Sequence, residues 1–108
     1  MGNDESSPAA MEKTLWNMKF TSKQLLSEQK KSEKKAAAEE KKVLDALKKN
    51  NREIARIYAS NAIRERNQAA NFVRLSSRID AVAGRVESAI RMNAVSYAKL
   101  GGAGRCVV

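Results

Sequence analysis

Apolar residues recur along this chain at three- and four-residue steps, which is the spacing of amphipathic helices. The residues that follow this spacing are Met11, Leu15, Met18, Leu25, Leu26, Val43, Leu44 and Leu47 in the first half, and Ile54, Ile57, Phe72, Leu75, Ile79, Val82, Val86 and Ile90 in the second. Between Ser27 and Lys42 alanine is the only apolar residue type, so this section relies on helix propensity and on ion pairs such as Glu39 with Lys42. The pattern predicts two long helices, of which the second has the clearer apolar stripe.

One turn signal divides the two helices. No proline or glycine occurs between Ala9 and Ala83, and the only local turn signal in that run is the pair Asn50-Asn51. Asparagine tolerates the left-handed conformation at the end of a helix and can also cap the next helix. We therefore predict an all-α fold, a long antiparallel two-helix hairpin with disordered termini.

The expected boundaries follow from the residues at both ends. Pro8 stands in or just before the first turn of helix one, and glycines follow Leu100. We expect a flexible leader at residues 1–10, helix one at residues 11–49, the turn at residues 50–51, helix two at residues 52–99 and a flexible tail at residues 100–108. Because each helix can bury only one stripe against the other, the hairpin leaves apolar surface for further elements or other subunits.

The formal net charge of +9 points to anionic partners such as phosphate backbones or acidic lipid headgroups. Every basic residue before Asn50 is lysine, and every one after Asn51 is arginine except Lys99. Lysines near an anionic leaflet contribute about 1 kcal/mol each, although a solvated face kept soluble by charge explains them equally well. The candidate membrane-binding residues are Lys13, Lys19, Lys23, Lys30, Lys31, Lys34, Lys35, Lys41 and Lys42.

Helix two carries a cluster of arginines beside its apolar stripe. Arg56, Arg74, Arg78 and Arg85 fall within roughly 40° of one another on a helical wheel. This clustering predicts that they face one charged partner together.

The composition argues against catalysis. The chain has no histidine and one cysteine, Cys106, so the Cys/His zinc spacings and the histidine-based catalytic arrangements are absent, and a reducing compartment is the natural setting. We expect no enzyme activity, no metal and no cofactor. No apolar stretch reaches the roughly 18 residues of a spanning helix, so we expect a protein that is soluble or attached to a membrane only at its surface.

Two short features near the start of the chain have competing interpretations. Gly2 and Ser6 match the M-G-x-x-x-[ST] pattern for N-myristoylation, which would add a weak membrane signal, whereas the alternative is an ordinary flexible leader. Trp16 and Phe20 lie one turn apart and would suit a membrane interface, but packing against a partner helix is the favoured interpretation.

Two other classes of protein compete for the basic charge. A basic helical nucleic-acid-binding protein would share the net charge, yet the aromatic content is only 5% and no zinc finger, leucine-zipper basic region or RNA-binding aromatic signature occurs. A plain coiled-coil spacer is weakened by the interrupted apolar pattern of helix one. We therefore expect no nucleic-acid partner and keep such a protein as the alternative function.

Several short sequences resemble a known family. In helix two these are ARIYA at residues 55–59, NAIR at residues 61–64 and RIDAVA at residues 78–83; upstream, MEK at residues 11–13 and KFTSK at residues 19–23 lie at the start of helix one. Residues 51–83 resemble the second helix of the class 1 charged multivesicular body proteins of ESCRT-III. The resemblance covers about Met11 to Lys99.

This resemblance implies a non-enzymatic subunit that polymerises on endosomal and other membranes, shapes or severs membrane necks, and is remodelled by an AAA ATPase. It implies a cytoplasmic protein at the surface of endosomal or multivesicular body membranes, with other ESCRT-III subunits as partners. The family continues into further helices and a C-terminal ATPase-binding motif, whereas this sequence stops at Val108, which puts ATPase binding in doubt. The residues expected to contact other subunits are Arg56, Phe72, Arg74, Leu75, Arg78, Ile79, Val82, Arg85 and Val86.

Overall fold

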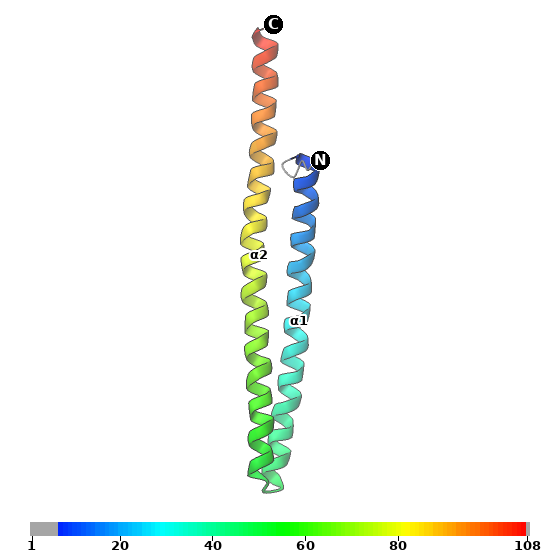
Figure 1. The fold of residues 1–108 in the computed structure, drawn as a ribbon, viewed down its shortest axis with the longest axis vertical. Helices are drawn as coiled ribbons and strands as arrows, with labels where there is room; N and C mark the ends of the chain where they lie inside the picture. The colour runs from blue at the N-terminus through cyan, green and yellow to red at the C-terminus, as the bar shows by residue number, and fades with distance from the viewer. Residues whose placement is uncertain (1–6, 108) are drawn as a thin grey trace, which may run out of the picture. The chain divides into compact units, whose positions relative to one another are not determined.

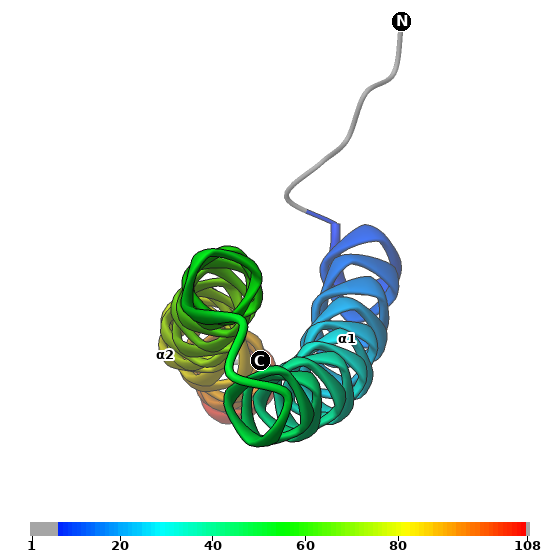
Figure 2. The ribbon, with the colours of Figure 1, turned by 90° about the horizontal axis from the view of Figure 1, so that it is seen from below.

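The computed structural model describes residues 7–107, with side chains described at residues 7–96, 98 and 99. Within this range the chain forms two helices, α1 (Pro8–Lys48) and α2 (Arg52–Val107), which run antiparallel on either side of one turn (Figures 1 and 2). The predicted all-α two-helix hairpin is therefore confirmed. The chain divides into two compact units that each contain part of both helices: Ser22–Ser77 forms one, and the residues up to Thr21 with those from Arg78 form the other.

Helix α1 begins with a serine cap. The Ser7 carbonyl accepts a hydrogen bond from the Met11 N–H (2.9 Å), and the Ser7 Oγ accepts one from the Ala10 N–H (3.1 Å), as expected of an N-cap residue. Pro8 follows at the first helical position, where its missing N–H costs nothing. Helix one thus starts slightly before the predicted residue 11, and residues 1–6 of the predicted leader lie outside the described residues.

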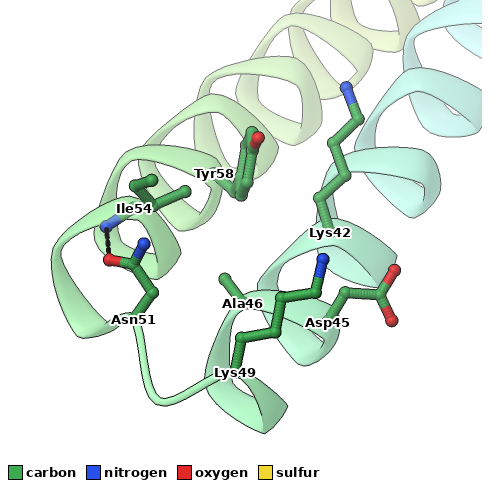
Figure 3. A pocket seen from close by; sticks show the side chains of 7 residues that line it. All are labelled: Lys42, Asp45, Ala46, Lys49, Asn51, Ile54 and Tyr58. Atoms are coloured by element: carbon green, nitrogen blue, oxygen red, sulfur yellow. Dashed lines mark hydrogen bonds between the residues drawn. The ribbon is translucent and has the colours of Figure 1, made fainter.

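The turn between the helices follows the predicted chemistry of two asparagines. Asn50 has a left-handed φ of 60°. The Asn50 N–H donates to the Leu47 carbonyl (2.9 Å) and the Asn51 N–H to the Ala46 carbonyl (2.8 Å), which closes α1 with a Schellman motif. The Asn51 Oδ1 then accepts a hydrogen bond from the Ile54 N–H (3.4 Å), so the same residue caps α2 (Figure 3).

Helix α2 extends further than predicted. Its predicted end is residue 99, but α2 continues to Val107, so this predicted end is wrong. Each glycine in a helix costs about 1 kcal/mol relative to alanine, yet it still donates and accepts in the helical ladder, unlike proline. None of the described glycines has a positive φ. The glycines of residues 101–104 therefore weaken this part of the helix without ending it.

Small side chains form the seam between the two helices. Every buried side chain in the described part of the chain is alanine or serine. The buried residues are Ser22, Ser32, Ala36 and Ala46 on α1, and Ala55, Ala62, Ala69, Ser76 and Ala83 on α2. Those of α2 recur every seven residues, which is the repeat that keeps one stripe of an under-wound helix against its partner. Small residues let the two backbones approach closely, but they bury little apolar surface.

Larger side chains occupy the alternate positions of the seam and are only half-buried. On α1 these are Met11, Leu15, Met18, Leu25, Gln29, Glu39 and Val43, and on α2 they are Tyr58, Glu65, Phe72, Ile79, Val86 and Ile90. Glu39 and Glu65 each hold one carboxylate oxygen out of contact with solvent and without a hydrogen-bond partner. Because a shielded polar atom without a partner is costly, this central part of the seam contributes little stability.

A pair of buried serines ties the helices together within the Ser22–Ser77 unit. The Oγ atoms of Ser22 and Ser76 lie 2.7 Å apart, and each hydroxyl is also within 3.5 Å of the other residue's carbonyl oxygen. Such hydrogen bonds form only when the two residues face each other, so the pair specifies the antiparallel register.

Candidate functional site

The outer face of α1 consists of the positions that point away from α2, and in the Ser22–Ser77 unit it is strongly basic. From Lys23 to Leu44 these exposed positions hold no acidic residue. The lysines on this face are Lys23, Lys30, Lys34, Lys41 and Lys48, of which Lys48 was missed in the sequence analysis. Lys48 follows Lys34 and Lys41 at steps of seven residues, and this spacing is the signal that identifies it. Leu44, 59% exposed, lies among them.

In the other unit, the outer face of α1 carries Lys13 and two aromatic rings. Trp16 and Phe20 stack on each other with ring centroids 5.4 Å apart and an interplanar angle of 11°. Their side chains are 64% and 48% exposed. The favoured interpretation of these residues as packing anchors is therefore wrong within this chain, because they lie on the side of α1 opposite to the seam.

The nine predicted membrane-binding lysines are all exposed, but they do not share one face. Lys19, Lys35 and Lys42 lie at the edges of the helix pair, and Lys31 lies at the rim of the outer face. Several of these are neutralised locally, since the Nζ atoms of Lys19, Lys31 and Lys42 lie 3.3, 3.4 and 3.5 Å from the carboxylates of Glu87, Glu28 and Glu39. The predicted pair of Glu39 with Lys42 is confirmed.

An ion pair between Glu40 of α1 and Arg66 of α2 links the two helices. The Arg66 Nε and Nη2 atoms donate to the two carboxylate oxygens of Glu40, each at 2.8 Å. The hydrogen bonds and charge of Arg66 lower the pKa of the Glu40 carboxyl, and Glu40 raises the pKa of Arg66. Glu40 thus joins the edge of the helix pair, which leaves the outer face of α1 uncompensated.

The predicted subunit-contact residues of α2 divide into two groups. Phe72, Ile79 and Val86 are half-buried at seam positions facing α1. The exposed members of the set are Arg56, Arg74, Leu75, Arg78, Val82 and Arg85. The single apolar stripe read from the sequence is therefore partly used inside the hairpin, and only its flank remains free for a partner.

A shallow pocket of about 380 Å³ lies beside the turn (Figure 3). Its lining residues are Lys42, Asp45, Ala46, Lys49, Asn51, Ile54 and Tyr58. The Lys42 Nζ lies 5.5 Å from the centroid of the Tyr58 ring, a cation–π distance. The lining combines the apolar Ala46 and Ile54 with charged side chains of both signs, from Lys42, Lys49 and Asp45.

Other candidate chemistry is limited. Among the side chains that the structure describes, at residues 7–96, 98 and 99, no cluster of cysteine or carboxylate groups is arranged to hold a metal ion. The described helices also contain no stretch that is long and apolar enough to cross a membrane. Gly2, the candidate lipidation site, and the side chain of Cys106 lie outside the described residues.

The fold and these surfaces define a basic two-helix hairpin with a close-packed seam and charged outer faces. No family model matches the chain. It is 56% identical over 86 residues to charged multivesicular body protein 1 of Dictyostelium discoideum, a match that covers 80% of this chain and 45% of that protein. It is 49% identical over 86 residues to charged multivesicular body protein 1a of Danio rerio, covering 80% and 43%.

Charged multivesicular body protein 1b of Homo sapiens is 50% identical over 73 residues, a match that covers 68% of this chain and 37% of that protein. The chain therefore belongs to the charged multivesicular body protein 1 class of the ESCRT-III family, as the resemblance of its second helix indicates. It spans less than half the length of these relatives.

Proposed function

We propose that this chain is an ESCRT-III subunit that binds anionic membranes through the outer face of α1 and assembles with other subunits through the exposed apolar side chains Leu75 and Val82 of α2. The observation that carries the proposal is the outer face of α1, which is rich in lysine and free of acidic residues between Lys23 and Leu44. The relatives are named for the multivesicular body, and the setting we propose is sorting at endosomal and multivesicular body membranes. The subunit acts there by assembly and membrane remodelling, without catalysis.

The composition of this face matches the chemistry of a bilayer interface. Each lysine near an anionic leaflet contributes about 1 kcal/mol, so several lysines in one row give weak but useful binding. Trp16 and Phe20 are exposed on the outer face of α1, and aromatic rings of this kind sit at the level of the lipid headgroups. Lysine stems can also reach the headgroups while covering apolar surface.

Assembly through α2 is favoured by apolar side chains that the hairpin does not bury. Leu75 is 45% exposed and Val82 is 41% exposed, although both belong to the apolar stripe of the helix. Exposed apolar surface of this kind is stabilised when a neighbouring subunit covers it. Polymerisation would in turn multiply weak lipid contacts on individual subunits into firm attachment.

Vesicle flotation with two matched triple variants tests the membrane face. The variant Lys30→Gln, Lys34→Gln and Lys41→Gln removes three charges from the outer face, and it should lower the partition coefficient onto phosphatidylserine vesicles roughly a hundred-fold, from about 3 kcal/mol. The matched control removes three charges from one edge of the same unit: Lys35→Gln, Lys42→Gln and Lys49→Gln. We expect this control to lose much less binding.

The fluorescence of Trp16, the single tryptophan, provides an independent readout. Because its ring is exposed, its emission should shift to shorter wavelength when anionic vesicles are added and should not shift with vesicles of phosphatidylcholine alone. Equal losses of binding in the two triple variants would contradict the assignment of the face. Binding to duplex DNA or RNA without binding to vesicles would favour the nucleic-acid alternative instead.

A further inference from the structure

The outer face of α2 in the Ser22–Ser77 unit is a second uncompensated basic surface. Arg56, Arg64 and Arg74 all lie exposed at positions that point away from α1. The only acidic residues of α2 in this unit are Glu53, in its first turn, and Glu65, which is half-buried in the seam. No acidic side chain therefore lies on this outer face between the first and the last of these arginines.

Two of the three guanidinium groups of this face are held in place by hydrogen bonds that do not neutralise them. The Arg64 guanidinium donates to the Asn61 side-chain oxygen, and the Arg74 Nη1 donates to the Asn71 Oδ1 (2.5 Å), both one helical turn earlier. Within the described residues, none of the three arginines forms an ion pair. Each therefore keeps its full charge and free N–H groups that can bind phosphate or carboxylate oxygens.

Exposed apolar side chains lie among these arginines. Ile57 is 57% exposed and Ile63 is 62% exposed, and both lie on the same outer face as Arg56 and Arg64. The outer face of α1 in this unit has a similar composition, with lysines, the exposed Leu44 and no acidic residue between Lys23 and Leu44. A nucleic-acid backbone has no apolar surface that would cover the isoleucines, and the described α2 face has no aromatic ring on which bases could stack. A bilayer interface suits both residue types.

The two basic outer faces lie on opposite sides of the helix pair. Each helix is about 10 Å across, so the faces are separated by roughly 20 Å. This separation exceeds the Debye length of about 8 Å at physiological ionic strength, so an anionic surface bound to one face does not screen the other. One flat surface can engage only one of the faces at a time.

We propose that the Ser22–Ser77 unit binds two anionic bilayers at once, one through the lysine face of α1 and a second through the arginine face of α2. This inference rests on the proposed function, because the first bilayer is the one that α1 binds there. The second contact converts a membrane-coating subunit into one that draws two membranes together. It requires no second copy of the chain.

A vesicle-bridging assay tests this inference with the full chain. Phosphatidylserine vesicles are fixed to beads, the protein is added, and the capture of fluorescent phosphatidylserine vesicles is measured. The wild-type chain should capture them, and added salt should abolish the capture. The variant Arg56→Gln, Arg64→Gln and Arg74→Gln should still float with vesicles but should lose bridging roughly a hundred-fold.

The edge variant with Lys35→Gln, Lys42→Gln and Lys49→Gln is the matched control and should retain bridging. Helical circular dichroism should be unchanged in both variants, since glutamine is a good helix former. Wild-type protein that floats with vesicles without bridging them would overturn this inference and leave the proposed function standing, whereas a failure to float would overturn both.

Other outcomes identify a different occupant for the α2 face. Bridging by the arginine variant at the wild-type level would mean that self-assembly joins the vesicles, which overturns the inference. If the variant no longer floats, α2 is the primary membrane face, which also overturns it. The inference is also overturned if the binding of duplex DNA or of an acidic peptide depends on these arginines while bridging does not.

Discussion

Replacing Ala69 with leucine should destabilise the hairpin by about 1–3 kcal/mol, the usual cost of overfilling a close-packed site. Ala69 is 4% exposed and belongs to the small residues that recur every seven positions on α2. The Ser22–Ser76 pair sets the antiparallel register. Gln29 lies seven residues after Ser22 and Ala69 lies seven residues before Ser76, so the register places Gln29 opposite Ala69. Leucine adds three carbons at this point, so either the helices separate or the side chain leaves its preferred rotamer.

The sign of the change is informative because the alternative predicts the opposite. If the seam had spare room, the added carbons would stabilise the hairpin by roughly 0.8 kcal/mol each. Urea unfolding followed by helical circular dichroism measures the difference, at a protein concentration where the midpoint no longer depends on concentration. Ala70→Leu is the matched control, since Ala70 is the next residue of the same helix and is exposed.

The control should stay within about 0.5 kcal/mol of the wild-type chain, because exposed substitutions of similar helix propensity have small effects. If Ala69→Leu proves as stable as Ala70→Leu, or more stable, the seam is not closely packed and the account of its small residues is refuted.

Three further predictions concern stability. Gly84→Ala should raise stability by about 1 kcal/mol, since an added Cβ meets no heavy atom within 4 Å, and a lower melting temperature would contradict this. Ser22→Ala and Ser76→Ala should each cost about 1 kcal/mol, with the double variant costing less than their sum; an additive double-mutant cycle would mean that the hydroxyls do not interact. Arg66 lowers the pKa of Glu40, so the stabilisation from this ion pair is complete above the unfolded-state pKa and disappears as pH falls through the lowered folded-state pKa. Glu40→Gln should therefore melt below the wild-type chain at neutral pH and match it in acid, and a melting difference independent of pH would exclude this linkage.

The small-residue seam has a consequence for the proposed assembly. A seam whose fully buried positions are alanine and serine uses only part of the large apolar side chains of its two helices. Leu75 and Ile63 consequently remain 45% and 62% exposed. A hairpin of this kind leaves its exposed large apolar side chains for neighbouring subunits or lipid.

Local features of the fold could be predicted from the sequence because their causes lie within a few residues. Asn50 adopts the left-handed conformation because asparagine tolerates it, and Asn51 caps the next helix because its side-chain oxygen accepts a hydrogen bond from a helix N–H. The ion pair of Glu39 with Lys42 is likewise a short-range contact along one helix. The error at the end of α2 has a local cause as well, since the cost of several glycines was overestimated there.

The face of each helix that packs in the seam could not be predicted in the same way. A helical wheel gives weight to large apolar residues, so it grouped Leu75 and Val82 with Phe72 and Ile79 in one stripe, although the first two are exposed and the last two face α1. The seven-residue recurrence of small residues was visible in the sequence, but alanine is also the commonest filler of exposed helix positions.

By itself, the amino-acid sequence determined that the chain forms two helices, where they reverse, and that lysine dominates one arm and arginine the other. Helix propensity, caps and charge are properties of single residues and their near neighbours. Only the tertiary structure decided which stripe of each helix is buried, and with it which lysines and arginines form the outer faces and that Trp16 and Phe20 point outward. Burial depends on how closely two helices can approach, and residues more than fifty positions apart in the chain, such as Ser22 and Ser76, set that approach.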